Sequence, residues 1–315
     1  TAAIKGMYSY LGDPYTSYLD KDSTTNLMDR LNGEYKGIGV EITSTESGTM
    51  VMTVFDGSPA SKAGIMVGDI ITKVADNDVQ NSTPSEVSNL IKSTNGTTTI
   101  EVLRGGVYKT LEINVEKVSI PSVSSSNFDG VGYIKITTFS NNTYEQFKTA
   151  LSSLEKENID SLVIDVRNNG GGFLNAAVDI AELFIEKGKN VYGLETKEKT
   201  EYYKDSTKES RKYKVGILLN SASASASEIL AAALKESYGA TLLGLTSYGK
   251  GTVQETSELE TGGMIKYTTA YWLTPNGNKI NNVGLKPDVE ITGDYNDDMD
   301  YESDTQLLTA IKNMK

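Results

Sequence analysis

The chain contains no histidine and no cysteine among its 315 residues. Without them, neither a Ser-His-Asp triad nor a Cys-His pair can exist in this protein. A serine nucleophile would therefore need a different base. Lysine is the remaining candidate, because burial disfavours its charged form and lowers its pKa until it can accept a proton.

Long apolar runs and positive charge are also scarce. No apolar run reaches the length that a helix needs to span a bilayer, and a formal net charge of −12 argues against nucleic acid or an anionic membrane as the main partner. The 38% of hydrophobic residues suffices for sizeable cores, and 315 residues favour two or three domains. The chain begins at Thr1 without a signal peptide, so we expect a processed or shortened form of a longer protein.

The most informative stretch runs from Lys214 to Gln254. It opens with the apolar run 215–219, continues with serines and alanines over 221–227, and then has strong helix formers over 228–235. The serines are therefore predicted to lie on a strand-to-helix turn, where a nucleophile can project and backbone N–H groups remain free. A second apolar strand leads to Lys250, whose flanking glycines favour close packing and burial.

Two motifs in this stretch resemble those of the carboxyl-terminal processing proteases, the tail-specific Ser-Lys peptidases that usually carry a PDZ domain. The motifs are Ser-Ala-Ser-Ala-Ser-Glu-Ile at 223–229 and Gly-Lys-Gly-Thr-Val-Gln at 249–254. The resemblance implies that Ser225 is the nucleophile, that Lys250 is the base, and that Gln254 orients the lysine.

Three other patterns compete with this interpretation. A Ser/Ala run is usually a flexible linker, but here it stands between a predicted strand and a predicted helix. The stretch from Gly244 to Gly251 nearly matches a phosphate-binding loop, but Gly251 replaces the hydroxyl residue that binds Mg²⁺, and strand-like residues follow it. Ser153-Leu-Glu-Lys156 matches Ser-x-x-Lys, but it lacks a Lys-Thr-Gly partner and lies in a charged helical stretch, which indicates solvated surface.

Residues 35–117 resemble a PDZ domain. The pattern consists of a Gly-Ile-Gly before a strand, a proline-started short helix and a Gly-Asp turn within 57–74, a helix over 85–93, and a hairpin at Gly105-Gly106. The resemblance implies that a peptide adds to the sheet as an extra strand and that backbone N–H groups bind its terminal carboxylate. The expected peptide-binding residues are Gly37, Ile38, Gly39, Val40, Val87, Ile91 and Arg104, the last as a source of positive charge.

Residues 118–295 are predicted to form an α/β core, because strands that alternate with helices indicate a parallel sheet. The predicted strand 161–166 runs into the loop Arg167-Asn-Asn-Gly-Gly-Gly172, which is not a G-x-G-x-x-G dinucleotide fingerprint. It resembles instead the Asp-x-Arg-x-Asn-x-Gly-Gly loop of the same proteases, although Gly170 stands where they often have proline. The resemblance implies that the N–H groups of Gly171 and Ala226 bind the oxyanion.

The terminal segments are predicted to be helical. Residues 1–34 indicate a helix, a turn and a second helix, and we expect the Asp13-Pro-Tyr15 turn to be a packing corner rather than a functional element. Residues 296–315 are predicted to form an acidic tail and a helix capped by Asp304. The family resemblance implies that such terminal helices can form a homodimer contact.

The sequence as a whole predicts an α/β multidomain protein. A PDZ domain, with a mixed β-barrel-like sheet and helices, is joined to a parallel-sheet α/β core of the crotonase/ClpP-like kind, with helical terminal segments. The predicted activity is that of a serine endopeptidase that cuts protein substrates near their C-termini through an acyl-enzyme and needs no metal or cofactor. The PDZ domain would recognise the free C-terminus and gate the activity.

The resemblance also implies a bacterial, extracytoplasmic enzyme with a signal or membrane anchor upstream of this chain. Two alternatives belong to other classes. A non-catalytic PDZ scaffold with a degenerate core is disfavoured by the intact Ser225, Lys250 and Gln254. An acyl-CoA-type enzyme on a related core is disfavoured by the PDZ pattern.

Overall fold

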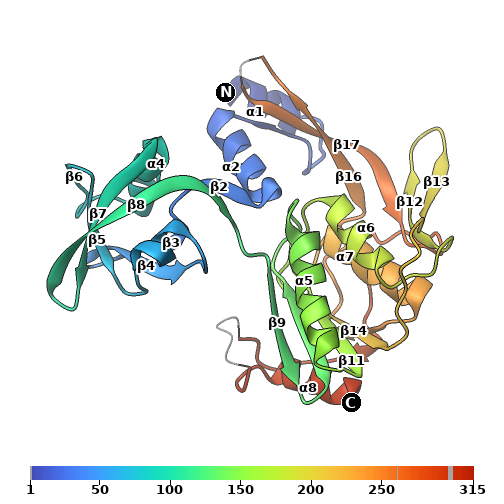
Figure 1. Ribbon diagram of the computed structural model, residues 1–315. Coiled ribbons are helices and arrows are strands. Elements are labelled where there is room, and N and C mark those ends of the chain that lie inside the picture. Colours follow the sequence, from blue (N-terminus) through green and yellow to red (C-terminus); the bar gives the residue numbers. More distant parts are fainter. Residues whose placement is uncertain (1, 261, 297–300) are drawn as a thin grey trace. The chain divides into compact units, whose positions relative to one another are not determined.

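The chain divides into two compact units in the computed structural model, which describes residues 2–260, 262–296 and 301–315. The first unit consists of Thr1–Leu31 and Ser122–Lys315, and the second consists of Asn32–Pro121. Each unit has its own hydrophobic core and its own sheets (Figure 1). The N-terminal segment and the C-terminal helix belong to the same unit as the α/β core.

The second unit is a seven-stranded antiparallel sheet with two helices. Its strand order is β2-β8-β7-β5-β4-β3, with β6 beside β5. The strands are β2 (Glu34–Gly37), β3 (Val40–Thr45), β4 (Gly48–Val54), β5 (Ile70–Val74), β6 (Asn77–Asp78), β7 (Gly96–Arg104) and β8 (Val107–Ser119). The helices are α3 (Pro59–Ala63) and α4 (Pro84–Ser93). Strands β7 and β8 form a hairpin at Gly105 and Gly106, both with positive φ, as the sequence predicts.

Helix α4 lies beside β3, the strand at one end of this sheet. The helix begins with a capping box in which Thr83 Oγ1 accepts from the Glu86 N–H, and the Glu86 carboxylate accepts from the Thr83 N–H. Val87 and Ile91 then pack into the core of this unit. An end strand next to a helix leaves backbone groups that another strand can pair with.

The first unit is built on a six-stranded sheet in the order β18-β15-β14-β11-β10-β9. All its pairs are parallel except β9 with β10, which confirms the predicted parallel α/β sheet. The strands are β9 (Val123–Phe128), β10 (Val131–Ile136), β11 (Ser161–Asp165), β14 (Lys214–Leu219), β15 (Thr241–Gly244) and β18 (Val289–Glu290).

Helices cover both faces of this parallel sheet (Figure 1). Alternate strand residues such as Ile164 and Ile217 pack with α5 (Thr143–Lys156), α6 (Leu174–Glu182) and α7 (Ala226–Ala233), whereas Val163 and Leu218 pack with α8 (Thr305–Met314). Helix α7 is followed by one π-helical turn, η1 (Leu234–Tyr238). Coverage on both faces explains why these strands read as continuous apolar runs rather than as alternating ones.

A second sheet of the first unit has the order β1-β17-β12-β13, with β16 paired to β17. Its strands are β1 (Ser17–Leu19), β12 (Asn190–Glu195), β13 (Thr200–Lys204), β16 (Thr252–Glu258) and β17 (Met264–Leu273). Strand β1 lies between α1 (Ala2–Ser9) and α2 (Lys21–Asn32) in the chain and pairs antiparallel with β17. The N-terminal segment is thereby joined to the hairpin that follows Lys250.

The C-terminal helix is tied to the end of β11 by buried charges. Arg167 is 2% exposed and forms ion pairs with Asp165 and Asp304, and its guanidinium also donates to Gln306 Oε1. Asp304 caps α8, as predicted, by accepting from the Leu307 N–H. Part of the predicted acidic tail, residues 297–300, lies outside the described residues. Among the described helices, none has the length and apolar character that crossing a membrane requires.

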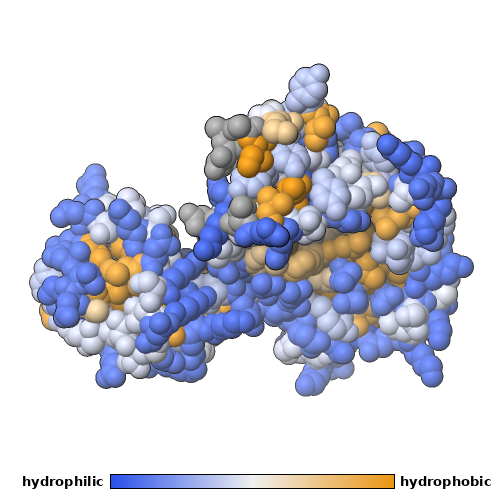
Figure 2. Space-filling view, turned by 90° about the horizontal axis from the view of Figure 1, so that it is seen from above, coloured by the Kyte–Doolittle hydropathy of each residue, from blue (hydrophilic) through white to orange (hydrophobic). Residues whose placement is uncertain are grey.

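Surface hydrophobicity is uneven over the first unit. Figure 2 shows hydrophobic side chains gathered in a hollow of this unit, framed by polar side chains. An apolar hollow with a polar rim is a common feature of ligand and substrate sites.

Candidate active site

Ser225 lies on the sharp turn between β14 and α7, as the sequence predicts. Its backbone has φ 57° and ψ −116°, a conformation that a residue with a side chain rarely adopts and that is characteristic of functional turns. Among the described residues, no group accepts from the N–H of Ala226, the first residue of α7. The turn therefore presents a hydroxyl next to an unpaired backbone donor.

The loop after β11 passes directly against this turn. The Asn169 carbonyl accepts from the Ala224 N–H at 3.0 Å and from Ser227 Oγ at 2.9 Å. Gly171 has φ +101°, and a Cβ built on it would lie 2.8 Å from Ser225 Cβ. Only glycine leaves room for the loop at this distance from Ser225.

The two predicted oxyanion donors differ in their present partners. The Ala226 N–H is unpaired among the described residues, whereas the Gly171 N–H donates to Asn169 Oδ1 at 2.8 Å. Asn169 itself is buried and donates through Nδ2 to the Ile136 carbonyl at 2.9 Å. Gly171 is therefore close to Ser225, but its N–H must be shared or released before it can bind an oxyanion.

Lys250 lies on the loop between β15 and β16 and is half-buried. Cβ atoms built on its flanking glycines would fall within 3.0 Å of residues 281–284, so the glycines allow the loop to pack against that segment. The buried Trp272 donates through Nε1 to the Lys250 carbonyl at 2.7 Å. Residues after Gly251 form strand β16, which agrees with the rejection of a phosphate-binding loop.

The environment of Lys250 favours its neutral form. Desolvation lowers the pKa of Lys250, the positive charge of Lys266 lowers it further, and Glu228 opposes both effects. Within the described residues, Lys250 Nζ has neither an ion pair nor a hydrogen bond, and it lies 5.1 Å from the centre of the Tyr15 ring. A lysine with a lowered pKa is neutral, and so able to accept a proton from a hydroxyl, at lower pH than an ordinary lysine.

Glu228 joins the backbone of Ser225 to the backbone of Lys250. Its carboxylate is 1% exposed and accepts from the Ser225 N–H at 2.9 Å, the Lys250 N–H at 3.0 Å, the Gly249 N–H at 2.7 Å and Ser247 Oγ at 2.5 Å. Burial raises the pKa of Glu228, although these four hydrogen bonds oppose the shift. The sequence analysis missed this residue; the available signal was a glutamate three residues after a serine at a helix start.

Gln254 on β16 lines the same cavity as the serine and the lysine. The cavity has a volume of about 370 Å³. It is lined by Leu27, Leu31, Gly170, Gly172, Phe173, Leu174, Ser225, Ala226, Ile229, Lys250, Thr252, Val253, Gln254, Thr256, Lys266 and Trp272. Gln254 Nε2 donates to Thr252 Oγ1 at 2.9 Å and to Thr268 Oγ1 at 3.3 Å rather than to Lys250. The structure thus brings Ser225, Lys250 and Gln254 into one apolar-walled cavity together with Ala226. Among the described residues, no hydrogen bond joins any two of these side chains.

The Asp13-Pro-Tyr15 turn was expected to be a packing corner, but it also contacts this site. Tyr15 lies under Lys250 Nζ, and Asp13 accepts a hydrogen bond from Thr268, the neighbour of Gln254. No local pattern in the sequence indicates this approach, because the turn and the lysine are brought together only by the pairing of β1 with β17.

The second unit contains a small groove of about 40 Å³ between β3 and α4. Four of the predicted peptide-binding residues are among those that line it: Gly37, Ile38, Val40 and Ile91. Val87 packs in the core beneath, and Gly39 has φ +86°. The Arg104 guanidinium instead forms a two-pronged ion pair with Asp69, and it also donates to the Gly64 carbonyl. Arg104 is therefore held by its own unit in this structure rather than presented to the groove.

Among the described residues, no group of three or more carboxylates lies in a position to hold a metal ion.

Comparison with known proteins assigns families to both units. Residues 130–291 match peptidase family S41, and residues 37–115 match the PDZ domain. A probable CtpA-like serine protease of Staphylococcus aureus is 40% identical over 294 residues, which cover 92% of this chain and 59% of that protein. A probable CtpA-like serine protease of Staphylococcus haemolyticus is 37% identical with the same coverage. The chain thus spans 59% of the length of these curated relatives.

Solved structures agree with this assignment. The photosystem II D1 C-terminal processing protease superposes with a TM-score of 0.56 at 29% identity, over 92% of this chain and 81% of that one. A Bacteroides fragilis protein, titled "Putative S41 protease", superposes with a TM-score of 0.60 at 16% identity, over 97% and 87% of the two chains, and shows the shared fold alone. Because the family match spans the α/β core that carries Ser225 and Lys250, this chain belongs to peptidase family S41.

Proposed function

We propose that this chain is a serine endopeptidase that cuts protein substrates near their C-termini, with Ser225 as the nucleophile and Lys250 as its base. The observation that carries the proposal is that the Ser225 turn and a lysine with a lowered pKa line one cavity. The printed names of the Staphylococcus relatives and of the D1 processing protease support the same activity. We also infer that the core is of the crotonase/ClpP-like kind, which its parallel sheet supports.

In this mechanism, neutral Lys250 takes the Ser225 hydroxyl proton as Oγ attacks the scissile carbonyl carbon. The Ala226 N–H, and the Gly171 N–H once it is shared or released by Asn169, stabilise the oxyanion. Collapse of the tetrahedral intermediate breaks the peptide bond, and Lys250 returns the proton to the leaving amine. Lys250 then activates a water molecule that hydrolyses the acyl-enzyme. Catalytic hydrogen bonds often form only when substrate is bound, which agrees with the lack of a hydrogen bond between Ser225 Oγ and Lys250 Nζ among the described residues.

Gln254 is proposed to hold Lys250 in position, and Glu228 to keep the two catalytic backbones together. Gln254 has an amide oxygen that is unpaired among the described residues and lines the cavity of Lys250. Glu228 is hydrogen-bonded to the backbone of both Ser225 and Lys250. Neither role needs a metal or a cofactor.

The second unit is proposed to bind the free C-terminus of the substrate and to gate the activity. An extended peptide would pair with β3 and place its last side chain in the groove that Ile38, Val40 and Ile91 line. Gly37 and Gly39 would bind the terminal carboxylate through backbone N–H groups. The ion pair of Arg104 with Asp69 argues against a direct role for that arginine in the groove.

The assembly and location of the protein are also proposals. A bacterial, extracytoplasmic enzyme with an anchor or signal upstream of this chain is supported by its resemblance to the Staphylococcus proteins, which are longer. A homodimer through the terminal helices is supported by the exposed apolar side chains of Met7, Tyr10 and Leu11 at the end of α1.

The deciding experiment incubates the protein with an unfolded protein substrate, beside Ser225→Ala and Lys250→Ala. Each variant should lose activity by on the order of 10⁴-fold while it stays folded. Proteolysis that persists in purified Ser225→Ala would refute the nucleophile, and a wild-type protein without any proteolysis would favour the non-catalytic scaffold. Amidating the C-terminus of one peptide substrate should slow its cleavage, and equal rates for the free and amidated forms would refute C-terminal recognition.

A further inference from the structure

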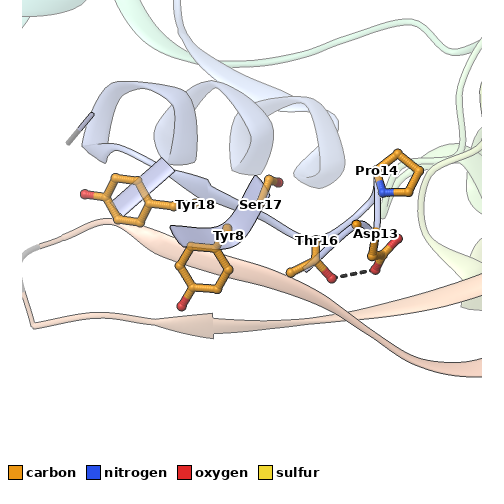
Figure 3. A pocket seen from close by; sticks show the side chains of 7 residues that line it. Tyr8, Asp13, Pro14, Thr16, Ser17 and Tyr18 are labelled. Atoms are coloured by element: carbon orange, nitrogen blue, oxygen red, sulfur yellow. Dashed lines mark hydrogen bonds between the residues drawn. The ribbon is translucent and has the colours of Figure 1, made fainter. Parts of the chain in front are cut away.

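The turn before β1 brings Asp13 to the hairpin of β16 and β17. Figure 3 shows Asp13, Pro14 and Thr16 on this turn, beside the hairpin, with the Thr16 hydroxyl bonded to the Asp13 carboxylate. Thr16 Oγ1 donates to Asp13 Oδ2 at 2.6 Å, and the Tyr15 N–H donates to Oδ1 at 3.0 Å. The chain then enters β1, which pairs with β17. The position of the carboxylate is therefore set both locally and by the sheet.

The same carboxylate accepts a hydrogen bond from β17. Thr268 Oγ1 donates to Asp13 Oδ2 at 2.6 Å. Partial burial raises the pKa of Asp13, but the hydrogen bonds from Thr16, Thr268 and Tyr15 outweigh it and lower the pKa below its usual value. The carboxylate is therefore ionised at neutral pH and can only accept. The single hydroxyl proton of Thr268 is therefore donated to Asp13 and is not available to another acceptor.

The hydrogen bond from Thr268 to Asp13 determines how the Gln254 amide is oriented. A threonine hydroxyl that has donated its proton can only accept from its next neighbour. Gln254 Nε2 donates to Thr268 Oγ1 at 3.3 Å and to Thr252 Oγ1 at 2.9 Å. Both hydrogen bonds that the Gln254 amide nitrogen donates therefore go to threonine hydroxyls. The amide oxygen has no partner among the described residues, and its side chain lines the cavity together with Lys250.

We propose that Asp13 is a positioning residue for the base, because its carboxylate acts through Thr268 to orient the Gln254 amide so that Oε1 is presented to the Lys250 amine. The inference rests on the proposed function of Lys250 and Gln254, and it adds the group that decides which end of the amide the lysine meets. An amide without such a constraint has two orientations of nearly the same shape. One of them would turn N–H donors toward an ammonium group and repel it.

Other groups around Lys250 must be separated from this effect. Lys266 on β17 lowers the pKa of Lys250, and Glu228 on α7 raises it. The Tyr15 ring lies 5.1 Å from Lys250 Nζ, and Tyr248 interacts with Tyr15. An Asp13→Asn exchange leaves all four groups in place. It also removes one negative charge from the region, so the test must distinguish a direct electrostatic effect from one that passes through Gln254.

The experiment measures how the acylation of Lys250 by a small amine-reactive reagent depends on pH. The full-length protein is labelled while folded and then digested, and the labelled fraction of Lys250 is measured by mass spectrometry of the peptides. This measurement needs no peptidase activity. In Asp13→Asn, we expect the Tyr15 N–H to go on donating to the side-chain oxygen of residue 13, so the new NH₂ group faces Thr268. This NH₂ group then donates to Thr268 Oγ1, and the Thr268 hydroxyl must donate to Gln254 instead of accepting from it. Gln254 then turns Oε1 toward Thr268, and the Lys250 ammonium loses its acceptor.

The expected result is a labelling midpoint of Lys250 about one pH unit lower in Asp13→Asn than in the parent, the size of one lost charge-assisted hydrogen bond. In proteolysis, kcat should fall about tenfold at the plateau while KM changes little. Asp20→Asn is the matched control. Asp20 lies in the same segment and accepts from the Ser23 N–H at the start of α2, so its labelling profile should equal that of the parent.

The double variant with Gln254→Ala decides the route. If Asp13 acts through Gln254, Asp13→Asn should cause no further shift in the Gln254→Ala background. A shift of the same size there would show a direct electrostatic effect and overturn the proposal. An unchanged midpoint in Asp13→Asn or in Gln254→Ala would also overturn it. If the labelling results are as expected but Ser225→Ala still cleaves substrate, the proposed function fails and the role of Asp13 in orienting the amide stands.

Discussion

Replacing Gly171 by alanine tests how closely the loop after β11 packs against Ser225. A Cβ at this position would lie 2.8 Å from Ser225 Cβ, 2.9 Å from the Ala224 carbonyl oxygen and 3.1 Å from the Ala226 nitrogen. Two of these three atoms are backbone atoms, which cannot rotate away. Either the loop or the Ser225 turn must therefore move.

The cost can be worked out from the same geometry. Gly171 has φ +101°, where alanine costs about 1–3 kcal/mol. Relief of the overpacked contacts costs about 1–3 kcal/mol more. We therefore expect Gly171→Ala to lower the free energy of unfolding by on the order of 2–6 kcal/mol. Because Ser225 is the proposed nucleophile, a shift of its turn by about 1 Å is expected to lower kcat by about 100-fold.

The neighbouring Gly170 provides the matched control. It is exposed, and a Cβ built on it meets nothing within 4 Å. Gly170→Ala should change the free energy of unfolding by less than about 1 kcal/mol, because its added methyl group meets no other protein atom. Denaturant unfolding and steady-state proteolysis of both variants, at a temperature where each is folded, make the comparison. Parent-like stability and activity in Gly171→Ala would refute the packing argument.

Three further predictions concern the charges around Lys250. Lys266→Met should move the rise of kcat/KM with pH to higher pH, because after desolvation the Lys266 charge is what lowers the pKa of Lys250; an unmoved profile would contradict this. Lys250→Met should abolish proteolysis. It should also raise the free energy of unfolding at pH values below the lowered pKa of Lys250, because the charged lysine is less stable in the folded protein than in the unfolded chain. Denaturant titrations should show this gain shrink as the pH rises, and a gain that is independent of pH would argue against a desolvated lysine. Glu228→Gln should lower the free energy of unfolding by about 3 kcal/mol or more, because the NH₂ group of the glutamine would face backbone N–H donors of Ser225, Gly249 or Lys250. A variant that unfolds at the same denaturant concentration as the parent would contradict this prediction.

Much of this protein is determined by local sequence. The apolar run before the serines and the helix formers after them place Ser225 on a strand-to-helix turn, because strand and helix preferences act over a few residues. The Thr83–Glu86 capping box and the Asp304 cap start their helices in the same way. The lack of histidine and cysteine restricts the choice of base wherever the chain folds.

The tertiary structure alone decided which groups surround the catalytic candidates. Glu228 meets both Ser225 and Lys250 only because the loop after β15 packs over the start of α7. Asp13 and Tyr15 reach the lysine and Gln254 only because β1 pairs with β17. Contacts between such distant segments depend on sheet order, register and side-chain packing, which a short sequence pattern does not specify. For the same reason, the sequence could indicate Gly171 as a donor but could not show that Asn169 Oδ1 occupies its N–H.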